Sequence, residues 1–303
     1  MFDKSLLVVD AWLSFFKSGL SVTNPYAFKT NDCQLYIQER CWRTPSVVNK
    51  GELGSFFEYQ VGDCRFFWPK NFSPSGLGWL YAEVFYPWEN NPSSYAHPRF
   101  TLKDRNWIMD AGACEGFFSY YAFSKGAARV LAVEPLTLLG QALQYTFAKQ
   151  ISAGNFEVYP GGLARQAGFI DLASDPNHAW DSHTAVSTVD SATRKVQVTT
   201  IDALVLERGW SEGGLIKMDI EGAEMAALQG AAKTLKRFKP QLAIAVYHNF
   251  LNARLCRDII LAANPEYHVD FRGMYGWFKP ARPISYLPIN CHVKSPHSRK
   301  MVA

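Results

Sequence analysis

Four side chains that could bind a ligand or take part in a reaction stand where short apolar runs end. Asp110, Glu134, Asp219 and His248 each close such a run. Short apolar runs bounded by turn residues are typical of buried strands. The carboxyl ends of parallel strands meet at one edge of a sheet, and open α/β sheets bind their ligands there. We therefore expect these four side chains to line one crevice.

The residues around the first of these strand ends predict a cofactor site. Gly112, Ala113 and Gly116 lie in a glycine turn between an apolar run and a helical segment, and the turn matches the dinucleotide pattern G-x-G-x-x-G poorly. The carboxylate of Asp110, just before this turn, would repel a pyrophosphate and attract a cation. S-adenosylmethionine carries a sulfonium and an ammonium group, whereas NAD carries a pyrophosphate. We therefore predict that Asp110, Gly112, Ala113 and Gly116 bind S-adenosylmethionine.

Glu134 predicts a ribose contact in the same site. It follows Gly112 by about twenty residues, the spacing at which an acidic residue binds the ribose hydroxyls of a nucleotide cofactor. Both NAD and S-adenosylmethionine contain a ribose, so Glu134 separates the two cofactors only in combination with Asp110.

Asp219, Glu221 and His248 are the candidate catalytic residues. Methyl transfer to an alcohol requires the acceptor to be positioned and its proton to be removed. His248 is a candidate base because the ordinary pKa of histidine is about 6.5. Asp219 would orient His248, and Glu221 lies close to Asp219 in the sequence. In an alternative arrangement, Asp219 and His248 ligate a divalent metal ion that acidifies the hydroxyl. Outside that alternative no residue is assigned to a metal.

The elements that must position these residues alternate between strand and helix from Asn106 onward. This alternation predicts βαβ units and a doubly wound, mostly parallel sheet, a Rossmann-like α/β fold. After Pro265, the runs EYHVDFRGM and PISYLPIN predict an antiparallel pair that closes the edge of the sheet. Residues 1–100 contain many turn signals and predict a helix and short strands, with a hairpin that turns at Gly62-Asp63.

Composition excludes several classes of protein. The 303 residues include 9 Trp, 14 Tyr and 21 Phe, and the aromatic residues are dense in the first third. Disordered segments are poor in aromatic residues, so this region is expected to fold. The net charge of +4 without a long basic run does not favour nucleic acid. No run reaches the ~20 apolar residues of a membrane span, and six scattered cysteines without a CxxC pair predict a cytoplasmic protein.

Several segments together resemble the FkbM-type methyltransferases that use S-adenosylmethionine. The resemblance is carried, in this order, by IMDAGACEG at 108–116, VEP at 133–135, VTTID at 198–202, IKMDIEGAE at 216–224 and VYH at 246–248. It covers roughly residues 105–290, and IKMDIEGAE is its most specific part. Residues 1–100 resemble no family that we can name.

The resemblance implies a class I methyltransferase fold, with a mostly parallel seven-stranded sheet and one antiparallel edge strand. It implies O-methylation of a hydroxyl on a sugar, glycan or secondary metabolite. It also places the turn that contains Leu163 near the adenine, so Leu163 is a further predicted cofactor contact. The predicted division is an aromatic-rich extension at 1–100, a methyltransferase domain at 101–293 and a basic tail at 294–303.

Three other functions remain open from the sequence. An NAD-dependent oxidoreductase is disfavoured by Asp110 and the poor glycine pattern. A nucleic-acid methyltransferase would carry an Asn/Asp-Pro-Pro-Tyr turn where this chain has Asp219-Ile-Glu221-Gly222. A non-catalytic module is disfavoured by the intact acids at the strand ends. The partners expected are therefore a small-molecule or glycan acceptor, with neither membrane nor nucleic acid. The aromatic region would pack on the sheet, cover the crevice or form a homodimer interface, with Trp79, Tyr81 and Glu83 nearest the site.

Overall fold

A mostly parallel sheet forms the centre of the protein. The computed structural model describes residues 30–39, 41–95, 102–103, 105–175, 178–184, 193–249, 251–273, 275–277, 285–287 and 290–294. The strand order is β13-β16-β12-β11-β4-β5-β6. The strands are β4 (Trp107–Ala111), β5 (Val130–Val133), β6 (Phe156–Tyr159), β11 (Gly214–Met218), β12 (Gln241–Ala245), β13 (His268–Arg272) and β16 (Asn290–Lys294). The five strands from β12 to β6 run parallel, which confirms the predicted α/β class.

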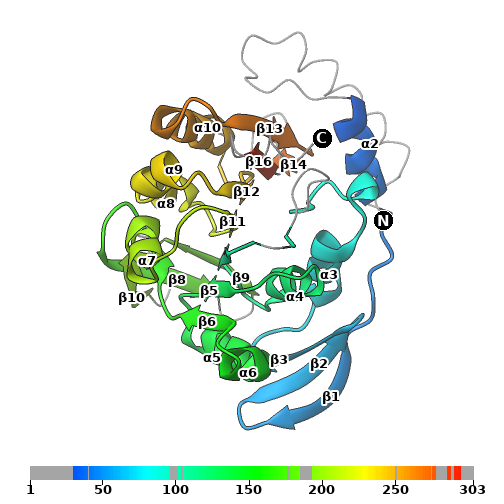
Figure 1. The fold of residues 1–303 in the computed structure, drawn as a ribbon. Helices are drawn as coiled ribbons and strands as arrows, with labels where there is room; N and C mark the ends of the chain where they lie inside the picture. Colours follow the sequence, from blue (N-terminus) through cyan, green and yellow to red (C-terminus); the bar gives the residue numbers. More distant parts are fainter. Residues whose placement is uncertain are drawn as a thin grey trace.

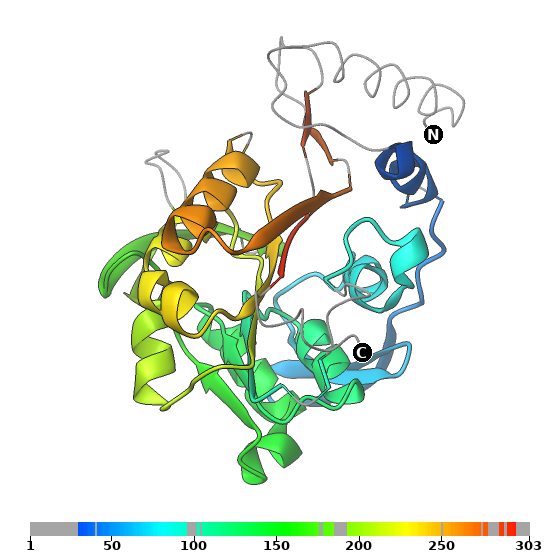
Figure 2. The same cartoon turned by 45° about the horizontal axis from the view of Figure 1, so that its top comes forward.

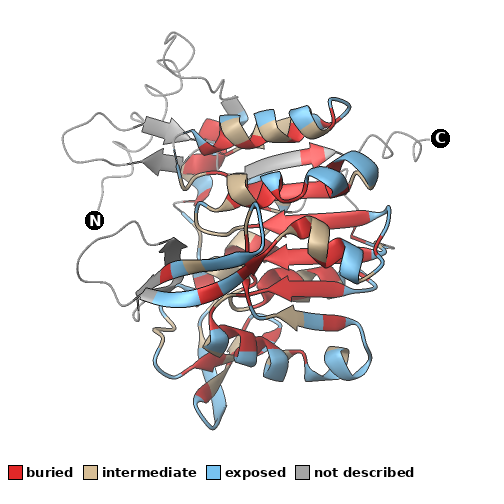
Figure 3. Cartoon of the chain, turned by 90° about the vertical axis from the view of Figure 1, so that its left-hand side faces the viewer, coloured by how far each residue is buried: buried red, intermediate tan, exposed pale blue. Residues whose placement is uncertain are grey.

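Helices cover both faces of this sheet (Figure 1). On one side lie α7 (Ile201–Glu207), α8 (Glu224–Gln229), α9 (Ala232–Arg237) and α10 (Asn252–Ala263). On the other lie α4 (Phe117–Ser124), α5 (Thr137–Thr146) and α6 (Ala148–Ser152). The central strands are buried almost throughout (Figure 3), as expected for a parallel sheet that is covered on both faces.

The alternation of side chains along β4 creates two separate cores. Trp107 and Met109 point to one face and belong to the core shared with α7 to α10. Ile108 points to the other face and packs with residues of α4 and α5. Because side chains alternate with a period of two, Asp110 lies on the same face as Ile108, beneath α4. This placement decides which residues can reach the Asp110 carboxylate.

The prediction placed the antiparallel strand at the edge of the sheet, but it lies one position inside the edge. β16 lies between β12 and β13 and pairs antiparallel with both, so the edge strand is β13. The predicted pair after Pro265 therefore exists, but its second member is Asn290–Lys294. Within the run PISYLPIN, β15 (Ser285–Leu287) pairs instead with β14 (Tyr275–Trp277).

A second sheet extends from the region between β6 and α7. Its order is β7-β10-β8-β9, formed by β7 (Gly162–Leu163), β8 (Gly168–Asp175), β9 (His178–Thr184) and β10 (Thr193–Thr199). The sequence predicted a strand near β10 but left residues 165–195 as a polar stretch. The additional strands β8 and β9 are therefore a finding of the structure.

The aromatic-rich N-terminal region packs against the helices on one side of the sheet. It contains α2 (Thr30–Glu39), β1 (Val48–Leu53), β2 (Phe56–Val61), β3 (Cys64–Pro69), α3 (Leu77–Phe85) and the short 3-10 helix η1 (Trp88–Asn90). Val61 pairs with Cys64, which confirms the hairpin at Gly62-Asp63. Phe66 of β3 contacts Phe117 of α4, with ring centroids 5.0 Å apart. Figure 2 shows this region on the opposite side of the molecule from α8 to α10.

The two ends of the predicted division lie outside the described residues. These are 1–29, within the predicted extension, and 295–303, within the predicted basic tail. Among the helices that the structure does describe, none is both long and apolar enough to cross a lipid bilayer.

Candidate active site

The four predicted strand-end residues lie along the carboxyl edge of neighbouring parallel strands. Asp110 is in the last part of β4, Glu134 follows β5, Asp219 follows β11, and His248 lies shortly after β12. These strands are adjacent in the order β12-β11-β4-β5. The sequence therefore placed the residues correctly on one edge of the sheet, where ligands bind in open α/β folds.

The glycine turn after β4 is tied to β5 by its own backbone. The N–H groups of Gly112 and Ala113 donate to the Val133 carbonyl at 3.0 and 3.4 Å. The N–H of Cys114 donates to Oε2 of Glu134 at 3.0 Å. Gly112 has φ of +72°, in the left-handed region that glycine adopts readily. The turn therefore lies directly over the ends of the two strands.

Glu134 lies at the carboxyl end of β5, beside the glycine turn. Oε1 of Glu134 accepts from the Leu136 N–H at 2.9 Å, and Oε2 accepts from Cys114. Burial raises the pKa of Glu134 to about 7, against the opposing effect of these two N–H donors. Each carboxylate oxygen can accept more than one hydrogen bond. The residue thus fits a ribose-binding role, which stays a prediction.

Asp110 differs most from its predicted surroundings. Its carboxylate is fully buried, with Oδ1 at 3.1 Å from Nζ of Lys217 and Oδ2 accepting from the Ser119 hydroxyl at 2.7 Å. A carboxylate that is held by a lysine is no longer an uncompensated charge for a cationic cofactor. Lys217 was not among the site residues predicted from the sequence, although it belongs to the IKMDIEGAE segment.

Two other predicted cofactor contacts have their side chains in the core. Leu163 is 4% exposed and packs with the cluster around β4, β5 and β11. Ala113 is 3% exposed and packs on the α4 side. Any cofactor contact at Leu163 or Ala113 would therefore have to come from the backbone.

Gly116 precedes α4 at φ of +85°, and a Cβ there would lie 2.8 Å from atoms of Leu143 and Phe147.

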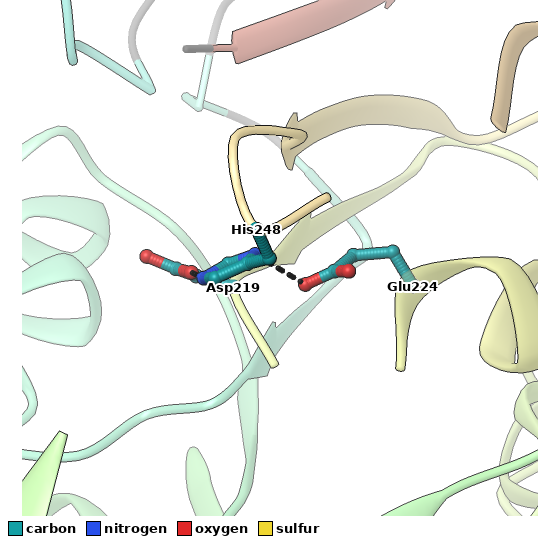
Figure 4. A group of neighbouring side chains, drawn as sticks. All are labelled: Asp219, Glu224 and His248. Atoms are coloured by element: carbon teal, nitrogen blue, oxygen red, sulfur yellow. Dashed lines mark ion pairs between the residues drawn. The ribbon is translucent and has the colours of Figure 1, made fainter. Parts of the chain in front are cut away.

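His248 is surrounded by three carboxylates. Its Nε2 lies 3.3 Å from Oδ1 of Asp219 and 3.3 Å from Oε2 of Glu221, and its Nδ1 lies 3.1 Å from Oε1 of Glu224. Figure 4 shows the imidazole ring between Asp219 and Glu224, with one carboxylate at each side. Both ring nitrogens therefore lie within ion-pair distance of carboxylates, an arrangement that favours the doubly protonated imidazolium.

The electrostatics agree with this geometry, while the prediction that His248 is the base stays a prediction. Burial lowers the pKa of His248, but hydrogen bonds to Glu221 and Glu224 and the charges of Glu224 and Asp219 outweigh it, so the pKa lies well above 6.5. Burial raises the pKa of Glu224, but hydrogen bonds from His248 and Asn252 lower it below its ordinary value. The raised pKa favours the imidazolium form of His248, which donates protons rather than accepting them.

Glu224 is the buried acceptor that holds the cluster of Asp219, Glu221 and His248 in place. The sequence did not single it out as part of the site. Its side chain is fully buried. Oε1 accepts from the N–H groups of Ile220 and Gly222 at 3.1 and 3.2 Å, and Oε2 accepts from Nδ2 of Asn252 at 2.9 Å. Its position at the start of α8 was a signal for an N-terminal carboxylate, but not for a contact with His248.

Replacement of Glu224 by Ala is expected to destabilise the protein by about 3–5 kcal/mol, because the buried His248 cation and the other donors lose their acceptor. This corresponds to a fall in the melting temperature on the order of 10 °C, measurable by calorimetry or circular dichroism. Glu224→Gln, which keeps an acceptor oxygen, should lose less. The exposed Glu207→Ala is the control. Equal losses of stability in Glu224→Ala and Glu207→Ala would contradict the role of Glu224 as the buried acceptor.

A resident divalent metal ion is not supported at this cluster. Asp219, Glu224 and His248 offer ligand atoms that lie within 4.8 Å of one another. A metal ion requires a neutral imidazole with a free lone pair. Here both ring nitrogens face carboxylates, and both oxygens of Glu224 already accept from N–H groups. The metal alternative is therefore not carried further.

The N-terminal region reaches this cluster through Tyr95, a residue that was not predicted from the sequence. The Tyr95 hydroxyl donates to Oδ2 of Asp219 at 2.6 Å, and the Tyr95 ring packs against Phe118 of α4. Of the three residues predicted to be nearest the site, Tyr81 packs against Phe85 and Phe117. Trp79 donates to Oε1 of Glu83 at 3.0 Å. No local pattern marks Tyr95, because its contact spans 124 positions.

Glu83 provides a pH-dependent contribution to stability. Burial, with the charges of Glu39 and Asp219, raises the pKa of Glu83 to about 8 from an ordinary 4.5. Between pH 4.5 and about 8, Glu83 is ionised in the unfolded chain but still protonated in the folded protein. Its contribution to stability is therefore lost as the pH rises through about 8. Glu83→Gln should therefore raise the melting temperature relative to the native protein more at pH ~8.5 than at pH ~5. Glu207→Gln is the control, and an equal difference at both pH values would contradict the raised pKa of Glu83.

Known protein families provide an independent comparison for this geometry. A sequence model described as the Methyltransferase FkbM domain matches residues 110–278, more than half of the chain. The chain belongs to the FkbM methyltransferase family. The match begins at Asp110 and includes Glu134 and the cluster around Asp219 and His248. The resemblance found in the sequence is thereby confirmed.

Solved structures that are similar to this FkbM family member share little sequence with it. An FkbM methyltransferase from Methylobacillus flagellatus is 22% identical, with a TM-score of 0.47 over 70% of this chain and 47% of that one. A precorrin-6y C5,15-methyltransferase from Geobacter metallireducens is 13% identical, with a TM-score of 0.34 over 64% and 82% of the two chains. An rRNA methylase from Streptococcus thermophilus is 14% identical, with a TM-score of 0.35 over 64% and 89%.

These structural similarities add nothing to the family assignment, because their TM-scores are below 0.5. The chain also spans only about half the length of the Methylobacillus protein. A comparison with curated proteins finds no match.

Proposed function

We propose that this FkbM family member is an S-adenosylmethionine-dependent O-methyltransferase that acts on a hydroxyl of a sugar, glycan or secondary metabolite. The observation that carries the proposal is the family match over residues 110–278, which includes the carboxyl edge of the sheet. The acids and His248 that gather at that edge support it. Its cofactor would supply a methyl group on a sulfonium, which is already a good leaving group.

The residues present fit the cofactor at two places. The turn from Gly112 to Gly116 lies over the ends of β4 and β5 and is tied to Glu134 through the Cys114 N–H. Each oxygen of Glu134 already accepts one N–H, and the ribose hydroxyls would be further donors to the same oxygens. We infer that the pocket for the donor lies at this turn and that the acceptor lies nearer Asp219 and His248.

Glu221 is our candidate for the group that takes the acceptor's proton. Oδ1 of Asp219 faces His248 and Oδ2 accepts from Tyr95, and both oxygens of Glu224 accept from N–H groups. Glu221 is the most exposed carboxylate of the three, at 30%, and burial raises its pKa against the hydrogen bond from His248. A raised pKa makes a carboxylate a stronger base. His248 would hold Asp219 and Glu221 in place.

The charges at this end of the site favour an uncharged or cationic acceptor. Asp219, Glu221 and Glu224 lie around His248, so three carboxylates face one imidazole. Such a surface would repel the phosphates of a nucleic acid. A neutral polyol can instead donate its hydroxyls to the carboxylates. This supports a small-molecule or glycan acceptor over RNA.

The proposal is tested with S-adenosylmethionine labelled in its methyl group. The purified protein is incubated with three groups of acceptors, namely methyl glycosides, hydroxylated polyketides and RNA oligonucleotides. We expect label in a hydroxyl-bearing neutral acceptor. Label found only in RNA would contradict the proposed acceptor class, while label in no acceptor and no binding of the cofactor would contradict the proposed activity.

A further inference from the structure

Lys217 and Asp110 form a buried charge pair between β11 and β4. They are direct partners in the register of the two parallel strands. Asp110 is fully buried and Lys217 is 5% exposed, and Nζ lies 3.1 Å from Oδ1. The Ser119 hydroxyl of α4 donates to the other carboxylate oxygen. Both carboxylate oxygens of Asp110 therefore have a partner within the protein, Oδ1 in the ion pair and Oδ2 in a hydrogen bond.

Lys217 also holds the glycine turn. Its Nζ donates to the carbonyl oxygen of Gly112 at 2.7 Å and reaches that of Ala111 at 3.4 Å. The Tyr95 ring lies over the ammonium group, with its centroid 5.3 Å from Nζ. One ammonium group thus connects the end of β4, the turn that follows it and the aromatic region.

The position of Gly112 leaves the turn little freedom. A Cβ at Gly112 would lie 1.8 Å from the carbonyl oxygen of Asp219. The turn therefore passes directly over the start of the segment that carries Asp219, Glu221 and Glu224. A small displacement of Gly112 would move both the cofactor turn and the catalytic segment.

The charge of Lys217 is maintained by its surroundings. Burial lowers the pKa of Lys217, but the charges of Asp110, Asp219 and Glu115 outweigh this and raise it. Removal of one partner from a buried ion pair leaves the other charge uncompensated, which costs more than the pair itself contributes. Asp110 and Lys217 should therefore behave as one unit.

We propose that Lys217 is a positioning residue of the cofactor turn, and that Asp110 acts by holding Lys217 rather than as the counter-ion of a cationic cofactor. The inference rests on the proposed function for its cofactor. It contrasts with the simplest interpretation of the sequence, in which Asp110 attracts the sulfonium or ammonium group. The two interpretations predict effects of opposite sign when Lys217 is removed.

The test is a double-mutant cycle of Lys217→Met, Asp110→Asn and the double variant, with Lys217→Arg and the exposed Lys233→Met as controls. Binding of S-adenosylmethionine is measured by calorimetry. If Lys217 positions the turn, Lys217→Met should weaken binding about tenfold or more, and Asp110→Asn should cost less affinity in the Lys217→Met background than in the native one. Lys217→Arg should lose less, and Lys233→Met should bind normally.

Two further measurements need no cofactor. The double variant should melt above the Lys217→Met single variant, and hydrogen exchange of a peptide covering residues 111–117 should be faster in Lys217→Met. Tighter cofactor binding by Lys217→Met, additive melting temperatures or unchanged exchange in that peptide would each overturn the inference. Failure of the native protein to bind S-adenosylmethionine would instead contradict the proposed function, while the melting and exchange results would still decide the role of Lys217.

Discussion

Replacement of Glu221 by Gln is expected to lower the turnover of methyl transfer by about 10²–10⁴-fold, the usual contribution of a general base. The affinity for S-adenosylmethionine should stay unchanged, because Glu221 lies on the acceptor side. Glutamine keeps the shape of the side chain but accepts no proton. The measurement is the initial rate with the hydroxyl acceptor identified by the labelled-methyl assay.

The backbone at Glu221 gives this prediction a second basis. Glu221 has φ of +54°, a conformation that is uncommon for residues other than glycine and that concentrates at functional sites. Within the described part of the chain, its only polar side-chain partner is His248, through Oε2. Its other oxygen is thus available for the acceptor hydroxyl.

The pH dependence of the rate tests whether Glu221, rather than His248, is the base. The rate of the native enzyme should rise with pH as Glu221 loses its proton, at a pH above the ordinary carboxyl value because its pKa is raised. Glu221→Gln should lack this rise, and the exposed Glu207→Gln should keep both the rise and the full rate. A fully active Glu221→Gln variant would contradict the assignment of the base.

The second large effect is expected at Gly112. Gly112→Ala should lose at least about 4 kcal/mol of stability, and with it cofactor binding, because a mutation that overlaps a backbone atom belongs to the most destabilising class. The new Cβ would lie 1.8 Å from the carbonyl oxygen of Asp219. This oxygen cannot move without displacing the segment that carries Asp219, Glu221 and Glu224.

Gly154 offers a matched control for the backbone conformation. Its φ is +73°, against +72° at Gly112, but no atom lies within 4 Å of the position of its Cβ. Gly154→Ala should therefore cost only the roughly 1–2 kcal/mol of a left-handed residue with a side chain. The two variants are compared by denaturant unfolding. A similar loss at both positions would show that the close contact of Gly112 with Asp219 is wrong.

The local pattern of the sequence was sufficient to place one edge of the sheet. Asp110, Glu134, Asp219 and His248 each end an apolar run, and parallel strands bring such ends together. The hairpin at Gly62-Asp63 was also local, because two strands and their turn are contiguous. These features depend on neighbouring residues only.

The sequence did not show which charges neutralise one another. The pairing of Lys217 with Asp110 depends on the register between β4 and β11, which are about a hundred residues apart. The raised pKa of His248 depends on three carboxylates that converge after β11. Tyr95 reaches Asp219 only through packing of the N-terminal region on α4. The strands β8 and β9 were missed because their polar residues give no apolar run.

Calorimetric titration of the native protein with S-adenosylmethionine and, separately, with NAD tests the central claim most directly. We expect saturable binding of S-adenosylmethionine with a stoichiometry of about one per chain, and no binding of NAD. Binding of NAD alone would contradict the proposed methyltransferase function.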